Sequence, residues 1–149
     1  MTFIVTSIYL IGSLRNEQVP IIGDELRKAG FEVFDEWYSA GPEADDYFKK
    51  YHQERGIGYA EALKSYAAKH IFAFDKFHLD RCESAVLVLP AGRSGHLELG
   101  YVAGCGKPTF VLMDEATAND RYDLMYQFAN GVFFDLNSLV EELKRCDAI

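Results

Sequence analysis

The stretch AVLVLPAGRSGHLELGYVAGCGKPTFVLM, residues 85–113, decides the fold. Residues 85–89 form an apolar, β-branched run that predicts a buried strand ending at Pro90. A turn over residues 92–95 and a helix over residues 97–105 follow, and residues 108–113 predict another buried strand. Because two parallel strands need a crossover that is usually helical, this stretch predicts a parallel βαβ unit.

The rest of the chain repeats this alternation. Strands are predicted over residues 3–11, 31–34 and 132–134, and helices over residues 16–29, 59–81, 121–128 and 137–145, with a break near residues 70–74 in the long one. Gly30 stands where a glycine commonly ends a helix. We therefore expect one α/β domain over residues 1–149, a doubly wound sheet of about five parallel strands with helices on both faces.

Residues 35–58 form the least regular segment, with Gly41-Pro42 and many acidic and aromatic side chains. A connection of this length inside a compact domain is usually functional or contains a short helix of its own.

The net charge of −8 and the pI of about 4.9 disfavour binding to a nucleic acid polymer. A small phosphorylated ligand stays possible, because a few arginines and backbone N–H groups can hold it. Cys82, Cys105 and Cys146 are odd in number and lack CxxC spacing, which is typical of free thiols. No apolar run approaches the roughly 20 residues that span a bilayer. We expect a cytoplasmic protein without membrane association.

Ligand sites in open parallel sheets lie beyond the carboxyl ends of the strands. In this chain, residues 12–16, 35–58 and 90–96 follow the first three strands. Glu98 is predicted in the first turn of the helix after the third strand, where the helix dipole would keep its carboxylate ionised. An ionised carboxylate suits a nucleophile, although glutamates in first turns are often merely electrostatic.

The loop after the first strand contains Gly12, Ser13 and Arg15. Glycine allows a ligand close to the backbone, and serine and arginine can donate to a phosphate. A turn with a helix cap and a solvated arginine is the alternative. Asp75, in FAFDKFHLD, is either exposed or held in an aromatic pocket with a perturbed pKa. Two carboxyl groups in different environments are what glycosyl transfer needs.

Several common chemistries lack their motifs in this sequence. The four histidines show no metal-ligand spacing such as HExxH, so no metal is expected. His96 beside Ser94 does not make a catalytic triad, because no GxSxG elbow is present. GxGxxG and GxxxxGK[ST] are absent as well, which disfavours dinucleotide and Walker-type ATP binding.

Together these segments resemble the nucleoside 2-deoxyribosyltransferase family, including the 2'-deoxynucleoside 5'-phosphate N-hydrolases. The resemblance rests on Tyr9 in IYLIGSLRN, on Glu98 in SGHLELG, and on the position of Asp75 ahead of the third strand. It implies a flavodoxin-like fold in which Glu98 is the nucleophile and Tyr9 orients it. Asp75 would contact the base or assist its departure.

The resemblance also implies binding roles. Gly12, Ser13, Arg15 and Ser94 would contact a 5'-phosphate. Asp123 and Met125, in DLMY, would reach into the site of a neighbouring subunit, which implies a homodimer or a higher homo-oligomer with a shared active site. Gly92, which we expect to contact the substrate, stands where the transferases usually carry an aspartate, and Arg93 adds charge nearby. Both departures favour a nucleotide-acting hydrolase.

The expected function is cleavage of the N-glycosidic bond of a (deoxy)nucleoside 5'-monophosphate or nucleoside through a covalent glycosyl-Glu98 intermediate. Water or a second base would then release the sugar, without a metal or an organic cofactor. Asp35 and Trp37 would line the base pocket, Trp37 by stacking, unless it is a core or interface aromatic. A non-catalytic nucleotide-sensing module and an NAD-cleaving signalling domain are the alternatives.

Overall fold

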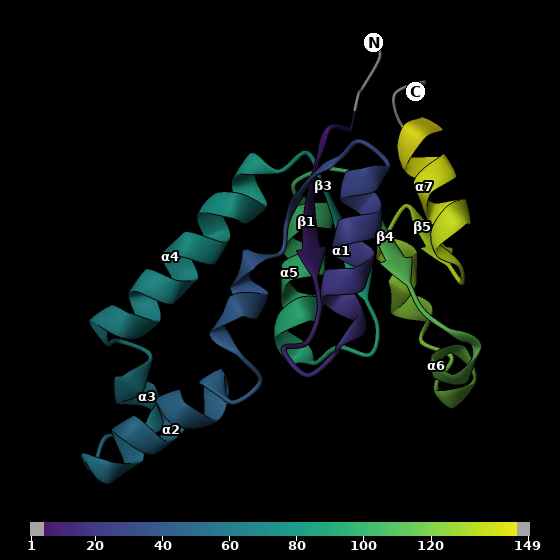
Figure 1. Cartoon of the computed structure of the whole chain (residues 1–149). Helices are drawn as coiled ribbons and strands as arrows, with labels where there is room; N and C mark the ends of the chain where they lie inside the picture. The colour runs from purple at the N-terminus through teal and green to yellow at the C-terminus, as the bar shows by residue number, and fades with distance from the viewer. Residues whose placement is uncertain (1–4, 146–149) are drawn as a thin grey trace.

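A computed structural model describes residues 5–145. Its centre is a five-stranded, all-parallel sheet in the order β2-β1-β3-β4-β5 (Figure 1). This is the flavodoxin-like strand order, so the predicted fold class is confirmed. The strands are β1 (Ser7–Ile11), β2 (Glu32–Phe34), β3 (Ser84–Val88), β4 (Thr109–Leu112) and β5 (Gly131–Phe133).

Helices cover both faces of the sheet. The α-helices are α1 (Gln18–Lys28), α2 (Ala44–Glu54), α3 (Tyr59–Ala62), α4 (Tyr66–Arg81), α5 (Arg93–Gly104), α6 (Glu115–Asp120) and α7 (Leu136–Arg145), and the 3-10 helices are η1 (Glu36–Ala40) and η2 (Leu124–Phe128). Within residues 5–145, no helix is both long and apolar enough to cross a membrane.

Alternate side chains of each strand enter two separate cores. On one face Ile8 and Leu10 of β1 pack with apolar residues of α1 and α7. On the other face Tyr9 and Ile11 pack with residues of α4 and α5. Nearly all these strand residues are buried, because in a doubly wound sheet both faces are covered by helices.

Two helix predictions were wrong in detail, and one helix was missed. The break in the long helix lies at residues 63–65 and not near residues 70–74, because Ser65 caps α4 by accepting a hydrogen bond from the Ala68 amide at 3.1 Å. Helix α5 begins at Arg93, so most of the predicted turn over residues 92–95 is its first turn. Helix α6 was missed, although Asp114 caps it by accepting from the Thr117 amide at 2.7 Å.

Other predicted elements are confirmed with shifted ends. Strand β1 begins at Ser7, and the predicted residues 3 and 4 lie outside the described chain, as does Cys146. Gly30 follows α1 with φ +104°, a conformation that favours glycine at a helix end. The irregular segment 35–58 contains η1 and α2. Together with α3, helix α2 forms an arm at the far end of α4, and most of this arm lies away from the sheet (Figure 1).

Candidate functional site

Tyr9 of β1 and Glu98 of α5 meet above the sheet. The Tyr9 hydroxyl donates a hydrogen bond to Glu98 Oε2 at 2.9 Å. Gly95, one turn before Glu98, allows this approach, since a Cβ there would lie 3.1 Å from the Ile11 side chain and 3.2 Å from Leu87. On the other side of Tyr9, the ring of Phe34 packs at a centroid distance of 5.1 Å. The packing of α5 and β2 thus fixes the Tyr9 hydroxyl at the Glu98 carboxyl group.

Burial decides the protonation of this pair. Desolvation raises the pKa of Glu98 to about 7, the Tyr9 hydrogen bond opposes this rise, and the charge of Asp75 adds to it. Burial also raises the pKa of Tyr9, with the charges of Glu98 and Asp75 as further causes, so this phenol stays protonated. The Tyr9 hydroxyl therefore remains a hydrogen-bond donor to Glu98, whose carboxyl group can gain or lose a proton near neutral pH.

The expectation that the helix dipole keeps Glu98 ionised was wrong. Because α5 begins at Arg93, Glu98 lies in its second turn, beyond the first turn in which the dipole acts most strongly. Desolvation by the surrounding core is the larger effect at this position.

Asp75 of α4 completes the cluster. It is partly buried, and desolvation raises the pKa of its carboxyl group. Its neighbour Phe74 packs against Phe34, which also packs against Tyr9. The charge of Asp75 contributes to the raised pKa values of Tyr9 and Glu98. We call Tyr9, Asp75 and Glu98 the Glu98 site. Two carboxyl groups with raised pKa values beside a phenol can supply a nucleophile and a proton donor.

The loop after β1 lies at the carboxyl edge of the sheet, as predicted. A Cβ at Gly12 would lie 2.7 Å from the Val19 side chain, so packing against α1 already requires glycine there. Ser13 Oγ accepts a hydrogen bond from the Arg15 amide at 3.1 Å. The Arg15 guanidinium is exposed and pairs with Asp46 of α2 at 3.0 Å. This surface ion pair is weak, so Arg15 can exchange Asp46 for another anion.

Asp35 and Trp37 differ in how far they match their predicted roles. Asp35 is buried on the face covered by α1, where it forms an ion pair with Arg27, so it lies across the sheet from Glu98. Trp37 is partly buried against both cores, and its indole N–H donates to the Leu10 carbonyl at 2.8 Å. This indole lies beside Gly12, with its ring 3.7 Å from where a Cβ would stand.

The start of α5 carries the remaining predicted residues of this helix. Gly92 is its N-cap, and Ser94 is exposed in its first turn. Ser94 precedes Glu98 by four residues, so both side chains project from the same face of the helix. Ser94 thus lies one turn closer than Glu98 to the open edge of the sheet.

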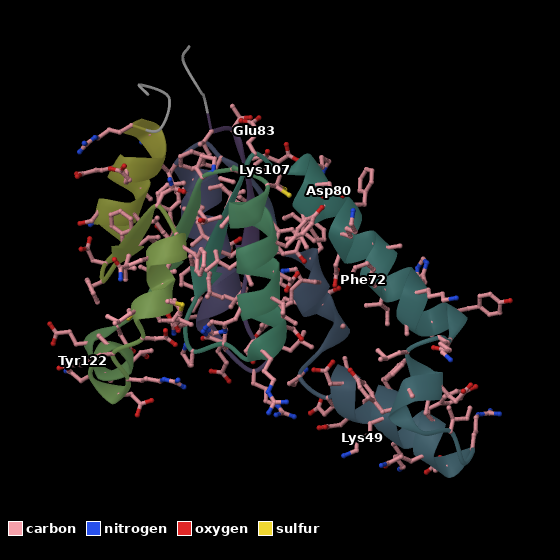
Figure 2. The ribbon with its side chains drawn as sticks, turned by 180° about the vertical axis from the view of Figure 1, so that it is seen from behind. Lys49, Phe72, Asp80, Glu83, Lys107 and Tyr122 are labelled. Carbon is pink, nitrogen blue, oxygen red and sulfur yellow. The ribbon has the colours of Figure 1, made fainter. Side chains whose placement is uncertain are left out.

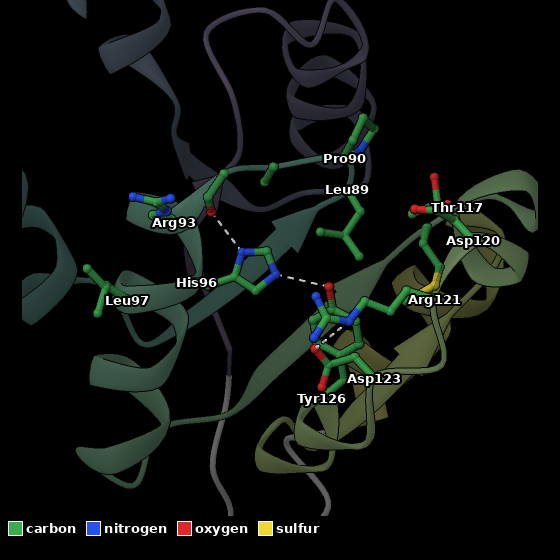
Figure 3. Close-up of a pocket in the computed structure, with 13 residues that line it drawn as sticks. Leu89, Pro90, Arg93, His96, Leu97, Thr117, Asp120, Arg121, Asp123 and Tyr126 are labelled. Atoms are coloured by element: carbon green, nitrogen blue, oxygen red, sulfur yellow. Dashed lines mark hydrogen bonds and ion pairs between the residues drawn. The ribbon is translucent and has the colours of Figure 1, made fainter.

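An open cleft of about 770 Å³ lies on the other side of α5 (Figure 3). Its walls come from the ends of β3 and β4, the start of α5, α6 and η2, and they include Gly92, Arg93, His96, Arg121, Asp123 and Tyr126. We call it the α5–α6 cleft. His96 bridges two of its walls, with Nδ1 2.7 Å from the Gly92 carbonyl and Nε2 2.9 Å from the Tyr126 hydroxyl.

Of the residues around this cleft, only Gly92 and Asp123 were predicted to bind substrate. Asp123 caps η2 by accepting from the Met125 amide at 2.9 Å, and Met125 itself is exposed. Neither residue belongs to the Glu98 site of its own chain. His96 and Tyr126 were missed as partners, since residues 30 positions apart have no spacing that links them. Within residues 5–145, no three histidine, cysteine or acidic side chains gather as metal ligands would.

The sequence matches no protein-family model. It matches no curated protein sequence either. Among solved structures, the chain is similar to a 2-deoxyribosyltransferase from the psychrotolerant bacterium Bacillus psychrosaccharolyticus, with a TM-score of 0.61 and 19% sequence identity. The likeness covers 91% of this chain and 90% of that one. The chain therefore has the fold of that 2-deoxyribosyltransferase over nearly the full length of both.

Proposed function

We propose that this protein cleaves the N-glycosidic bond of a nucleoside or nucleoside 5'-monophosphate, with Glu98 as the nucleophile. The contact between the Tyr9 hydroxyl and Glu98, with Asp75 nearby, is the observation that carries the proposal. The shared fold with a 2-deoxyribosyltransferase supports it. The resemblance of IYLIGSLRN and SGHLELG to nucleoside 2-deoxyribosyltransferases supports it independently.

In the first step the Glu98 carboxylate attacks C1' of the sugar. A C–O ester bond forms while the C1'–N bond breaks, and the bonding electron pair leaves with the base. The two neighbouring carboxyl groups share one proton, and in the reactive form Glu98 is ionised while Asp75 holds the proton that it donates to the departing base. Tyr9 donates its hydrogen bond to Glu98 and so holds the carboxylate in line for attack.

In the second step Asp75, now ionised, accepts a proton from water as the water oxygen attacks C1'. The ester bond breaks, the free sugar leaves and Glu98 regains its carboxylate. If the nitrogen of a second base attacks instead, the same intermediate gives a new nucleoside. Hydrolysis and transfer therefore use the same three residues and differ in the acceptor.

Ser13, Arg15 and Ser94 are the proposed contacts of a 5'-phosphate. Arg15 would leave Asp46 for the phosphate, since a phosphate offers a guanidinium stronger, bidentate hydrogen bonds. Gly92 and Trp37 would lie beside the sugar and base. Asp35 is left out of this site because it pairs with Arg27 on the other face of the sheet.

Self-association is part of the proposal. Helix α4 exposes a set of large apolar side chains that we call the α4 apolar surface: Tyr66, Ile71, Phe72, Phe74 and Phe77. So much exposed apolar area is typical of a surface that a partner covers. A second copy of the chain would bury it, and Asp123 and Met125 would contribute to the neighbour's site.

The test is to incubate the protein with the common nucleosides and their 5'-monophosphates, with and without a free acceptor base. Chromatography measures the released base. Glu98→Ala should abolish the release, whereas Glu61→Ala, on the distant helix α3, should leave it unchanged. Release without an acceptor establishes a hydrolase, and release only with an acceptor a transferase. No release from any substrate contradicts the proposal and favours a nucleotide-sensing module.

A further inference from the structure

Helix α4 contacts the body of the protein through its C-terminal half. Leu79 is buried in the core shared with α5, whereas Tyr66 at the start of the helix is 91% exposed. The first turns of α4 run outward to the α2–α3 arm (Figure 1). Asp75 lies between these two parts, where the helix leaves the body. Its position relative to Glu98 therefore depends on how firmly the last turns of α4 are held.

A polar cluster holds these last turns against α5. The Tyr101 hydroxyl of α5 donates a hydrogen bond to the Asp80 carboxylate of α4. Lys76 Nζ lies 2.8 Å from the other Asp80 oxygen and 5.5 Å from the centre of the Tyr101 ring. The three side chains thus link the two helices that carry Asp75 and Glu98.

Lys107 holds the end of the same helix. Its Nζ donates to the carbonyls of Leu79, Asp80 and Cys82 at 3.1, 2.6 and 2.9 Å. Figure 2 shows Asp80 and Lys107 side by side at this end of α4, with Phe72 farther along the helix. Backbone and side-chain contacts therefore fix the same turn.

The cluster lies next to the Glu98 site along both helices. Tyr101 follows Glu98 by three residues, about 4.5 Å along the axis of α5, and both project from one face. Lys76 follows Asp75 directly, and Asp80 lies about 7.5 Å beyond Asp75 along α4. A helix is rigid over such lengths, so a shift at Asp80 also moves Asp75.

We propose that Tyr101 and Asp80 are positioning residues, anchored by Lys76, that set the approach of Asp75 to Glu98. The inference rests on the proposed function, which assigns chemical roles to those two carboxyl groups. The pKa of Glu98 depends on Tyr9 from β1 and on Asp75 from α4. The pKa of Asp80 is lowered by Lys76, Tyr101 and Lys107. If α4 loosens, Asp75 moves away and water enters, and both changes lower the pKa of Glu98.

The first experiment compares Tyr101→Phe with Tyr59→Phe, a control at an exposed position of α3. Carbon-13 NMR follows the titration of the Glu98 carboxyl group, assigned with Glu98→Gln. In Tyr101→Phe the Glu98 midpoint should fall by about half a pH unit or more. The rate kcat should fall about tenfold with KM within about twofold, because Tyr101 touches no substrate. The control should match the wild type in each measurement.

A Glu98 midpoint in Tyr101→Phe equal to that of the wild type overturns the inference. Lys76→Met gives a second readout if Tyr101→Phe unfolds. Losing a nearby cation without any loosening would leave the Glu98 midpoint unchanged or raise it, whereas loosening lowers it, so only a fall supports the inference. The carboxyl titration needs no turnover, so it gives its result even if the wild type releases no base and the proposed function fails.

Discussion

The Tyr9 hydroxyl is the group that most directly favours an ionised Glu98. Its hydrogen bond opposes the rise that burial causes in the pKa of Glu98. Tyr9→Phe removes this bond and keeps the ring, so the pKa should rise beyond about 7. Because attack requires the carboxylate, the acid limb of kcat/KM against pH should move upward by about one pH unit. Tyr47→Phe, on the exposed surface of α2, is the control. A limb that stays or moves downward would contradict this role.

Glu98 should also make stability depend on pH. Its pKa rises from 4.5 in the unfolded chain to about 7 in the folded one. The folded state thus binds the proton more tightly, so this contribution to stability is present below 4.5 and is lost as the pH rises through about 7. Glu98→Gln removes the buried charge and should add roughly 1–2 kcal/mol of stability at pH 8, and little at pH 5. Urea unfolding at pH 5 and pH 8 measures this gain in stability. An equal gain at the two pH values would contradict the raised pKa of Glu98 as its cause.

The sequence grouped Tyr9, Asp75 and Glu98 into one candidate site but did not predict their protonation. The patterns around Tyr9 and Glu98 predicted that these two side chains meet, and their hydrogen bond above β1 agrees with this. Burial, however, depends on how closely α5 approaches the sheet, and this follows from Gly95 against Ile11 and Leu87. No local pattern reports such a contact. For the same reason the partner of Asp35, which is Arg27, became visible only in three dimensions.

At the scale of the element, α1 places a glycine against a buried carboxylate. An alanine Cβ at Gly23 would overlap Asp35 Oδ2 and crowd the Arg27 guanidinium. Gly23→Ala should therefore destabilise the fold by about 1–3 kcal/mol, even though alanine favours a helix. Gly100→Ala is the matched control, because its Cβ would meet no atom within 4 Å and it should stabilise α5 by about 0.5–1 kcal/mol. Urea unfolding compares the two, and a stabilising Gly23→Ala would show that Asp35 can move aside.

The end of a helix was predictable where a capping residue was recognised in the sequence, and not elsewhere. The glycine at position 30 located the end of α1. Ser65 and Asp114 are residue types that favour helix N-termini, but neither was predicted as a cap, so the break before α4 was misplaced and α6 was missed. Helix α5 begins at Arg93 and includes Gly95, although the glycines at positions 92 and 95 had predicted a turn. A helix packed against a sheet tolerates glycines because tertiary contacts outweigh their low helix propensity.

At the scale of the whole molecule, the α4 apolar surface should govern association. Phe72 is 66% exposed on α4, so Phe72→Ser should weaken the proposed contact between two copies. Sedimentation velocity should show the wild type as a dimer or larger and Phe72→Ser shifted toward the monomer. Ile21→Ser, at an exposed position of α1, serves as the control. Equal masses for the wild type and Phe72→Ser would remove this surface from the proposal.

The topology of the whole molecule was the most predictable feature. Alternating apolar runs and helical segments leave few arrangements for a parallel sheet, and the flavodoxin-like order is one of them. A short helix of its own was one of the two expectations for residues 35–58, and residues 59–62 were predicted as helix, but the arm that α2 and α3 form was not predicted (Figure 1).

Trp37 offers a practical consequence, because it is the only tryptophan in the chain. Its indole donates to the Leu10 carbonyl at 2.8 Å and lies beside Gly12, at the edge where a ligand would enter. All tryptophan fluorescence of this protein therefore comes from one ring next to the candidate site. A shift in emission on adding a nucleotide would report that the nucleotide binds, without a label and before any bond is broken.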